Sequence, residues 1–274
     1  MERKSIICIL CAVCFIVFTA GCISSTTQED EAAVIDESLQ SIDEQVDIEE
    51  EETLISSDEA NRDEEDIFHE NAAGMLLYQG HGSLRITTPE GKVIYIDPYA
   101  GEGYDLPADL IVITHPHQDH TAVELIETQN PDAQIITHEE ALVDGEHKIF
   151  ELDYVTIEAV EAGNNPNHDI TICVGYVLTL SDGISIYVSG DTSTTEQMTE
   201  LAERNLDYAF FCSDGVYNMD MDEASAAATL VRAKQSIPYH MSPGENFNSE
   251  RAELFEVENR LIIADGEEIL LISG

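Results

Sequence analysis

One segment of the sequence crowds metal-binding side chains together. Residues 114–120 read Thr-His-Pro-His-Gln-Asp-His, so three histidines and an aspartate fall within six positions. Imidazole nitrogens together with a carboxylate oxygen are ligands that zinc and similar divalent ions prefer in proteins. Pro116 disfavours helical geometry at His115, which makes the segment a loop. The spacing therefore predicts a metal site rather than a polar surface loop that is rich in histidine by chance.

The segments on either side of this loop decide where its side chains can lie. Residues 109–114 contain four consecutive aliphatic residues and are typical of a buried strand that ends at the loop. On the other side, Thr121 and Glu124 have the spacing of a capping box, which predicts a helix that begins there and ends before Asn130-Pro131. Loops at strand ends are where a rigid scaffold commonly carries functional groups.

From residue 73 onward, short apolar runs alternate with Gly, Pro and Asp turns. Hairpins come first and strands then alternate with helices, which predicts an α/β domain at 73–274 whose sheets are covered by helices. The further strands are expected at 75–79, 83–87, 92–97, 135–136, 148–152, 155–160, 170–180, 184–188 and 208–212, before 239 and within 261–272. The further helices are expected at 194–205, 222–233 and 248–258.

The histidine-rich loop resembles a known signature. His-Pro-His-Gln-Asp-His at 115–120 matches the HxHxDH motif of the metallo-β-lactamase superfamily. Over about residues 74 to 272 the chain is similar to the ascorbate-phosphate-lactonase-like branch of that superfamily. The segments that carry this resemblance are His81-Gly82-Ser83, Ile94-Tyr95-Ile96-Asp97-Pro98, Gly175-Tyr176-Val177, Ile186-Tyr187-Val188-Ser189-Gly190-Asp191-Thr192, Gly215-Val216-Tyr217-Asn218-Met219 with Glu223-Ala224, and Ile237-Pro238-Tyr239-His240.

The resemblance implies an αββα sandwich with two divalent metal ions at one edge, zinc first, with manganese or iron as alternatives. Position by position, it implies one set of metal ligands in His115, His117 and His168, and a second in Asp119, His120 and His240, with Asp191 bridging the two. Without the resemblance, Asp191 would be read as a residue that forms a turn or caps a helix. His240 would be read as a partly buried structural histidine. His138, at the end of another strand, is the rival of His168. His81 is a candidate for a supporting role beside the metals.

Such a site predicts hydrolysis of a small-molecule substrate. Two ions that share a water lower its pKa from 15.7 to about 7, and Asp119 would orient the resulting hydroxide. A lactone or other ester is the first expectation, and a phosphodiester or phospholipid is the alternative within the superfamily. An oxygen- or nitric-oxide-reducing di-iron protein would resemble HxExD, but His117 stands where the glutamate would be. A non-catalytic surface lipoprotein that binds metal or a partner is the alternative of another class.

The first 22 residues are typical of a targeting segment. Arg3 and Lys4 precede 16 largely apolar residues, which is short against the roughly 20 needed for a membrane span. Thr19-Ala20-Gly21-Cys22 resembles a lipobox, in which Cys22 becomes the lipidated first residue of the mature chain. The sequence therefore predicts an extracytoplasmic lipoprotein, with an uncleaved membrane anchor as the alternative.

The charge of the chain excludes one class of partner and suggests an environment. The sequence has 11 basic and 56 acidic residues, so nucleic acid, which requires a basic patch, is not expected as a partner. Residues 23–72 carry 19 acidic and one basic residue and are predicted to be a disordered linker. From residue 73, 36 acidic and 8 basic residues give a net charge of −28, which suggests adaptation to salt.

Cys173 and Cys212 are expected to be buried core residues, although a single disulfide between them stays open.

Overall fold

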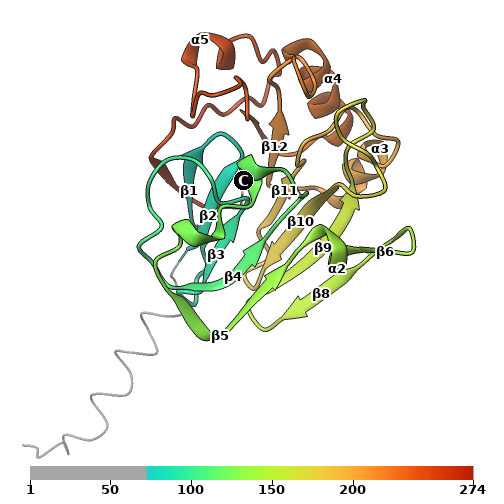
Figure 1. The fold of residues 1–274 in the computed structure, drawn as a ribbon. Helices are drawn as coiled ribbons and strands as arrows, with labels where there is room; N and C mark the ends of the chain where they lie inside the picture. Colours follow the sequence, from blue (N-terminus) through green and yellow to red (C-terminus); the bar gives the residue numbers. More distant parts are fainter. Residues whose placement is uncertain (1–72, 274) are drawn as a thin grey trace, which may run out of the picture. The chain divides into compact units, whose positions relative to one another are not determined.

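Two six-stranded sheets dominate the computed structural model of the chain, which describes residues 73–273 (Figure 1). The predicted targeting segment at 1–22 and the predicted linker at 23–72 lie outside the described residues, so both stay predictions. Within 73–273, no helix has the length and hydropathy of a membrane span.

The first sheet is built from the two ends of the described chain. Its strands are β1 Met75–Gly80, β2 Ser83–Thr87, β3 Val93–Ile96, β4 Ala108–Val112, β5 Gln129–Ile136 and β14 Glu267–Leu270. They lie in the order β14-β1-β2-β3-β4-β5. The β14, β1, β2 and β3 pairings are antiparallel, whereas β3–β4 and β4–β5 are parallel.

The second sheet repeats this arrangement of one antiparallel and one parallel half. Its strands are β8 Ile149–Leu152, β9 Val155–Glu161, β10 Val174–Leu180, β11 Ser185–Val188, β12 Tyr208–Cys212 and β13 Gln235–Tyr239. They lie in the order β13-β12-β11-β10-β9-β8. The pairs from β8 to β11 are antiparallel, and β11–β12 and β12–β13 are parallel.

The remaining elements are short. They are the helices α2 His138–Ala141, α3 Met198–Leu201, α4 Met221–Val231 and α5 Ser249–Ala252, the 3-10 turns η1 Gln118–His120, η2 Val123–Leu125 and η3 Ala202–Arg204, and the small hairpin of β6 Leu142–Val143 and β7 Glu146–His147. The longest helix, α4, begins where the Asp220 side chain accepts a hydrogen bond from the Glu223 N–H at 2.9 Å. It ends at Arg232, whose backbone is left-handed with φ +55°.

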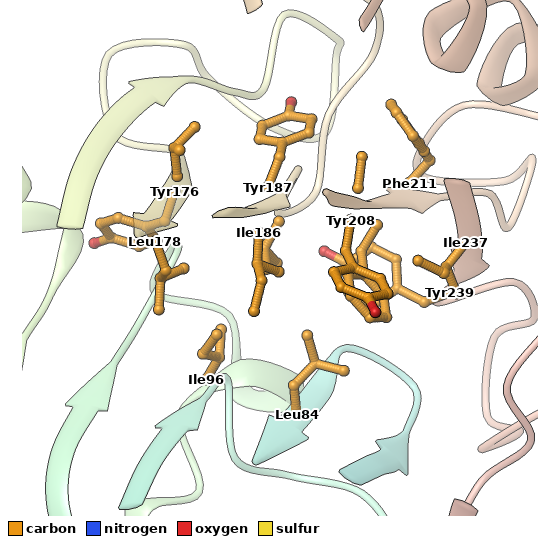
Figure 2. Packing of buried hydrophobic residues seen from close by; sticks show 14 of the residues in the cluster. Leu84, Ile96, Tyr176, Leu178, Ile186, Tyr187, Tyr208, Phe211, Ile237 and Tyr239 are labelled. Carbon is orange, nitrogen blue, oxygen red and sulfur yellow. The ribbon is translucent and has the colours of Figure 1, made fainter. Parts of the chain in front are cut away.

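The main core lies between the two sheets. Figure 2 shows Leu84 and Ile96 of the first sheet pointing toward Leu178 and Ile186 of the second. All four side chains are fully buried, and each contributes roughly 1.5–3 kcal/mol relative to an exposed position. This burial explains why both sheets read in the sequence as near-continuous aliphatic runs.

The outer layers differ between the sheets. Tyr187 and Phe211 point away from the interface between the sheets (Figure 2). On this side the alanines of α4 pack against β12, and Phe211 lies 6.1 Å from Phe255 between ring centroids. The first sheet carries a smaller cluster on its other face, which includes Tyr95, Tyr104 and Ile111. The residues of this cluster lie in strands, in the 98–107 loop and near η2, so the helical layer of the expected sandwich is thin here.

The predicted helix at Thr121 is wrong. The structure has the turns η1 and η2 there, and β5 already begins at Gln129, so Asn130-Pro131 lies in a strand. The Thr121 hydroxyl donates to the carbonyl of His117 at 3.1 Å instead of capping a helix. The Ala122 N–H donates to the carbonyl of Pro98, and the Glu127 N–H, which a helix would pair with the carbonyl of Val123, donates to the carbonyl of Tyr104 instead.

Two other predicted helices are much shorter than expected. The segment 194–205 contains only α3 and η3, and 248–258 contains only α5. The Arg260 guanidinium donates to the carbonyls of Glu253 and Phe255, at 2.7 and 3.2 Å, and so occupies acceptors that a continuing helix would need.

Cys173 and Cys212 are buried, and both thiols are free.

The topology brings several strand ends to one edge of the sandwich. In the first sheet, β3 leads into Asp97 and β4 leads into the histidine-rich loop. In the second sheet, the parallel strands β11, β12 and β13 lead toward Asp191, Asp214 and His240. Ligand sites commonly form where parallel strands end, because neighbouring carboxyl ends meet there.

Candidate metal centre

The histidine-rich loop is fixed by its contacts with both sheets. His115 is fully buried directly after the strand β4, and its Nε2 lies 3.1 Å from Nδ1 of His117. The carbonyl of Thr114 accepts from the Val174 N–H of the second sheet at 3.0 Å. The loop therefore bridges the two sheets at the edge where their strands end.

Asp191 lies at the centre of the cluster. Its Oδ2 is 3.2 Å from Nε2 of His168, 3.5 Å from Nε2 of His240 and 3.9 Å from Nε2 of His115. Its Oδ1 is 3.5 Å from Nε2 of His120. One buried carboxylate thus faces four imidazoles that come from three distant parts of the sequence.

The turn that presents Asp191 requires glycine. Gly190 has φ +60°, and a Cβ atom there would lie 2.8 Å from the carbonyl oxygen of Val174. The turn is also tied to the 163–168 loop, because the carbonyl of Asp191 accepts from the Gly163 N–H at 3.1 Å. The same loop carries His168, whose N–H donates to the Asn165 side chain at 3.0 Å. This shared backbone explains how the loop reaches Asp191.

A second group of side chains gathers around Asp119. Its Oδ2 is 3.1 Å from Nε2 of His81 and 4.0 Å from Nε2 of His240. The rings of His81 and His240 lie 3.7 Å apart between centroids. The His240 N–H donates to the carbonyl of His81 at 2.9 Å, so the β1–β2 turn and the end of β13 are joined directly at the site.

Three residues of this edge have left-handed backbones. His81, Asp97 and His240 have φ of +52°, +46° and +45°. Such conformations cost on the order of 1–3 kcal/mol each for a residue other than glycine, and they persist where surrounding contacts hold them. His81 donates its N–H to the carbonyl of Asn246 at 2.7 Å, and Asp97 donates its N–H to the carbonyl of Val112 at 3.0 Å. The fold therefore holds this edge in a strained arrangement.

Two carboxylates that the sequence analysis did not assign to the site support its histidines. Asp97 Oδ2 accepts from Nδ1 of His120 at 2.8 Å, and Asp214 Oδ2 lies 3.4 Å from Nδ1 of His240. Both carboxylates are buried. Asp97 stands in one of the segments that carry the family resemblance, and the sequence signal for Asp214 is an acidic residue two positions after a buried strand.

The electrostatics of the cluster keep Asp119 ionised and favour the neutral forms of His115 and His240. Burial and the neighbouring His120 lower the pKa of His115 to about 2. Burial likewise lowers the pKa of His240. The hydrogen bond with His81 lowers the pKa of Asp119 despite its partial burial. Ionised carboxylates and neutral imidazoles are the forms that bind metal cations.

His120 and Asp191 form a coupled buried pair. Burial opposes the charge on His120, but the carboxylates of Asp191 and Asp97 outweigh burial and hold the pKa of His120 well above its ordinary value. Burial would raise the pKa of Asp191, but the imidazoles of His240 and His120 hold it well below its ordinary value. The buried carboxylate of Asp191 therefore favours a positively charged group, such as a metal cation, beside it.

The polar atoms at the centre fit a metal cation. Nε2 of His120, Oδ1 of Asp191 and Nε2 of His240 are buried and make no hydrogen bond within the described residues. Buried polar atoms without partners are costly, so their convergence indicates a missing positive partner. Three groups have potential ligand atoms within 4.8 Å of one another: His115, His117 and His168; His81, Asp119, His120 and His240; and Asp97, His115 and His120. These nitrogens and oxygens are the donor types expected for zinc.

A cavity of about 580 Å³ opens onto this cluster. Its lining residues are His117, Asp119, Pro166, Asn167, His168, Asp191, Tyr217 and His240. The Asp119 side chain is 41% exposed, whereas that of Asp191 is 4% exposed, so Asp119 is the carboxylate that a substrate can reach. The volume is in the range of small-molecule sites.

The structure brings together all seven residues that the resemblance singled out as ligands: His115, His117, Asp119, His120, His168, Asp191 and His240. It also places His81 in the cluster, beside Asp119. His138, the rival of His168, begins α2, and none of the contacts described among residues 73–273 joins it to the cluster. The binding of metal by these residues stays a prediction.

The chain is similar to several known metal-dependent hydrolases. UPF0173 metal-dependent hydrolases of Ligilactobacillus salivarius and Thermodesulfovibrio yellowstonii are each 28% identical to the chain, over 187 and 224 residues. The alignments cover 61% and 67% of this chain and 84% of each relative.

Solved structures with similar folds include a protein of Parabacteroides distasonis that is provisionally described as a metal-dependent hydrolase. It is 29% identical, with a TM-score of 0.57, and the match covers 69% of this chain and 92% of that protein. The metallo hydrolase Igni18 of Ignicoccus hospitalis is 21% identical, with a TM-score of 0.56 and coverage of 73% and 99%, and this likeness supports the fold alone.

The family model of the beta-lactamase superfamily domain matches residues 75–240, which is more than half of the chain. None of these comparisons singles out the ascorbate-phosphate-lactonase-like branch, which stays a prediction. The segment matched by the family model contains every residue of the cluster, from His81 to His240. The chain belongs to the beta-lactamase superfamily and has the metallo-β-lactamase fold.

Proposed function

We propose that this chain is a metal-dependent hydrolase of neutral esters, lactones among them, that works with two divalent ions. The observation that carries the proposal is the convergence of two potential donor groups on Asp191, at the base of a cavity of about 580 Å³. Divalent ions held there would lower the pKa of bound water to about 7 and polarise a carbonyl oxygen. Zinc suits the donors best, and manganese and iron are the alternatives.

Some residues of the cluster would bind the ions, and others would orient the reactants. His115, His117 and His168 would hold one ion, with Asp119, His120 and His240 holding the other and Asp191 facing both. Asp119 is ionised and exposed to the cavity, so it can accept a hydrogen bond from the attacking water and orient it. His81 lies 3.1 Å from Asp119 and restricts the position of its carboxylate.

The lining of the cavity favours an uncharged substrate. Within the part of the chain that the structure describes, none of the cavity-lining residues is lysine or arginine. The net charge of −28 from residue 73 onward also repels anions at low salt. Tyr217 and Asn167 offer a half-exposed ring and an amide for the part of the substrate away from the reacting bond. A phosphodiester would have the proposed metal ions as its only cationic contacts, because the lining adds no lysine or arginine to them.

We also propose that the mature chain acts outside the cytoplasm as a lipoprotein attached to the membrane through Cys22. Its support is the sequence of the first 22 residues alone. Metabolic labelling with a fatty-acid analogue checks this proposal: the wild-type chain should be labelled and Cys22→Ala should not. Equal labelling of the two chains would contradict it.

Metal analysis joined to a substrate screen tests the proposed activity. The purified full-length chain should contain about two equivalents of metal per chain, by analogy with two-metal hydrolases. It should hydrolyse neutral lactones or esters faster than phosphodiesters or β-lactams. Turnover of phosphodiesters alone would overturn the substrate class, and bound metal without any turnover would favour a non-catalytic binding protein.

Two variants test the site itself. Asp119→Ala and His240→Ala should lose metal and activity together, while circular dichroism shows the fold retained. Asp153→Ala, in the exposed turn between β8 and β9, is the matched control and should keep both. Full activity in either site variant would contradict the assignment.

A further inference from the structure

Asp214 is a buried carboxylate that its own loop encloses. It follows β12, and its side chain is fully buried. Its Oδ1 accepts from the N–H groups of Val216 and Tyr217 at 2.6 and 2.7 Å, and its Oδ2 accepts from the Asn218 side chain at 2.7 Å. A buried charge is costly unless it is well bonded, so this loop conformation depends on the carboxylate.

The other side of Asp214 faces a predicted metal ligand. Its Oδ2 lies 3.4 Å from Nδ1 of His240, and this nitrogen makes no hydrogen bond within the described residues. The opposite nitrogen, Nε2, points to Asp191 at 3.5 Å. An imidazole can offer Nε2 to a cation only when the proton is on Nδ1. Both oxygens of Asp214 act as acceptors of N–H groups in its loop, so an N–H at Nδ1 of His240 is the form that suits Oδ2.

The loop that Asp214 holds also forms part of the cavity. Tyr217 lines it, and its carbonyl accepts from the side chain of Asn167 at 3.2 Å, which ties the loop to the segment before His168. Behind the loop, the guanidinium of Arg251 donates to the carbonyls of Ser213 and Asp214 at 3.1 and 2.7 Å. Arg251 therefore binds the backbone around Asp214, whereas the carboxylate of Asp214 contacts His240 and the Tyr217 loop.

We propose that Asp214 is a positioning residue that fixes His240 for metal binding and the Tyr217 loop for substrate binding through one carboxylate. The proposal rests on the proposed metal-dependent function. Oδ1 holds the loop through backbone N–H groups, and Oδ2 sets the tautomer of His240. Metal ligation and the shape of the substrate cavity therefore depend on the same side chain.

A conservative substitution separates the two roles. In Asp214→Asn the amide oxygen can replace Oδ1 and keep the bonds to the Val216 and Tyr217 N–H groups, which leaves an N–H group where Oδ2 faced His240 and accepted from the Asn218 side chain. The matched variant Asn218→Ala removes a contact of the loop and leaves the carboxylate facing His240. Both variants lose the Asn218 contact and should affect substrate binding, whereas only the first should also weaken metal binding.

Zinc affinity, measured by competition with a chelating dye, is the main readout, with Zn²⁺ alone as the probe. Loss of a carboxylate that orients a ligating histidine typically weakens metal binding by about 10–100-fold, and we expect this for Asp214→Asn. Asn218→Ala should change zinc affinity by less than about twofold, which is the variation expected for a site that is not coupled to the metal. The same variant should raise KM. In a His240→Ala background, Asp214→Asn should cause no further loss of affinity.

The tautomer of His240 gives a second measurement that needs no Asp214 variant. A long-range ¹H–¹⁵N spectrum of the zinc-free wild-type chain, with the His240 signals identified by their loss in His240→Ala, should show the proton on Nδ1. A proton on Nε2 would overturn the proposal, as would unchanged zinc affinity in Asp214→Asn or an equal loss in the His240→Ala background. A wild-type chain that binds no zinc or other divalent ion would instead overturn the proposed function, and this proposal with it.

Discussion

Replacing Asp97 tests whether one carboxylate sets both the stability of the metal edge and its affinity for metal. Asp97 is fully buried, and its Oδ1 accepts from the Thr114 N–H at 2.8 Å. Its Oδ2 accepts from the Thr114 hydroxyl at 2.6 Å and from Nδ1 of His120 at 2.8 Å. Asp97→Ala deprives all three donors of an acceptor, whereas Asp97→Asn keeps the shape and can still accept from the Thr114 N–H.

The cost of the alanine variant can be worked from these contacts. Each buried donor left without a partner costs about 1–3 kcal/mol, and removal of one partner of a buried ion pair costs about 3–5 kcal/mol. Because the donors share one acceptor, these costs overlap, and we expect a total loss of about 3–5 kcal/mol. In a domain of roughly 200 residues this lowers Tm by about 6–20 °C. Asp97→Asn should lose less, about 1–3 kcal/mol, because the bond from the Thr114 N–H survives and the Thr114 hydroxyl can accept instead of donate, which leaves the His120 contact as the one lost.

The two variants should differ in a second property. In Asp97→Asn an N–H group faces Nδ1 of His120 and favours the proton on Nε2, the nitrogen that faces Asp191 at 3.5 Å. Zinc affinity should therefore fall by about 10–100-fold although the stability loss is small. Calorimetric melting of the metal-free chain and dye competition with zinc check the two effects, with Asp153→Asn as the control. A metal-free Tm of Asp97→Ala equal to that of wild type, or wild-type zinc affinity in Asp97→Asn, would refute the reasoning.

Three further predictions address packing, salt and acid. Gly82→Ala should cost about 1–3 kcal/mol in metal-free melting and weaken zinc binding, because the new Cβ would lie 2.9 Å from Cε1 of His120; an unchanged Tm and affinity would contradict this. The Tm should rise with NaCl up to 1 M, where the Debye length is about 3 Å and the repulsion of 28 net negative charges is screened; a flat series would argue against adaptation to salt. Burial would raise the pKa of Asp207, but the Ser185 N–H and the Lys234 ammonium outweigh burial and lower it. The ionised Asp207 therefore stabilises the fold above its ordinary pKa of 3.8, and this stabilisation is lost as pH falls through the lower pKa of the folded state. Asp207→Asn should be less stable than wild type at neutral pH. Its Tm should also fall less steeply than that of wild type below pH 3.8. Parallel pH profiles of Tm for the two chains would count against this assignment.

Local patterns were sufficient for most strands and for the helix α4 but failed for the other predicted helices. The aliphatic run before Thr114 became β4, and the run before Ser189 became β11, because burial on both faces leaves a continuous apolar signature. The capping-box spacing at Thr121 was local as well, yet the segment formed turns. Its backbone groups found partners in the carbonyls of Pro98 and Tyr104, which no local pattern contains.

The sequence by itself determined the donor chemistry, because the HxHxDH spacing places imidazoles and a carboxylate within one short loop. The resemblance to a known family extended that loop to His168, Asp191 and His240. His81 was a candidate from the sequence for a supporting role, but only the tertiary structure placed it beside Asp119 and added Asp97 and Asp214 to the same edge. The distances that join them depend on which strand ends meet at the edge of the sandwich. Strand order and sheet packing set that edge, and both are fixed by contacts between residues far apart along the chain.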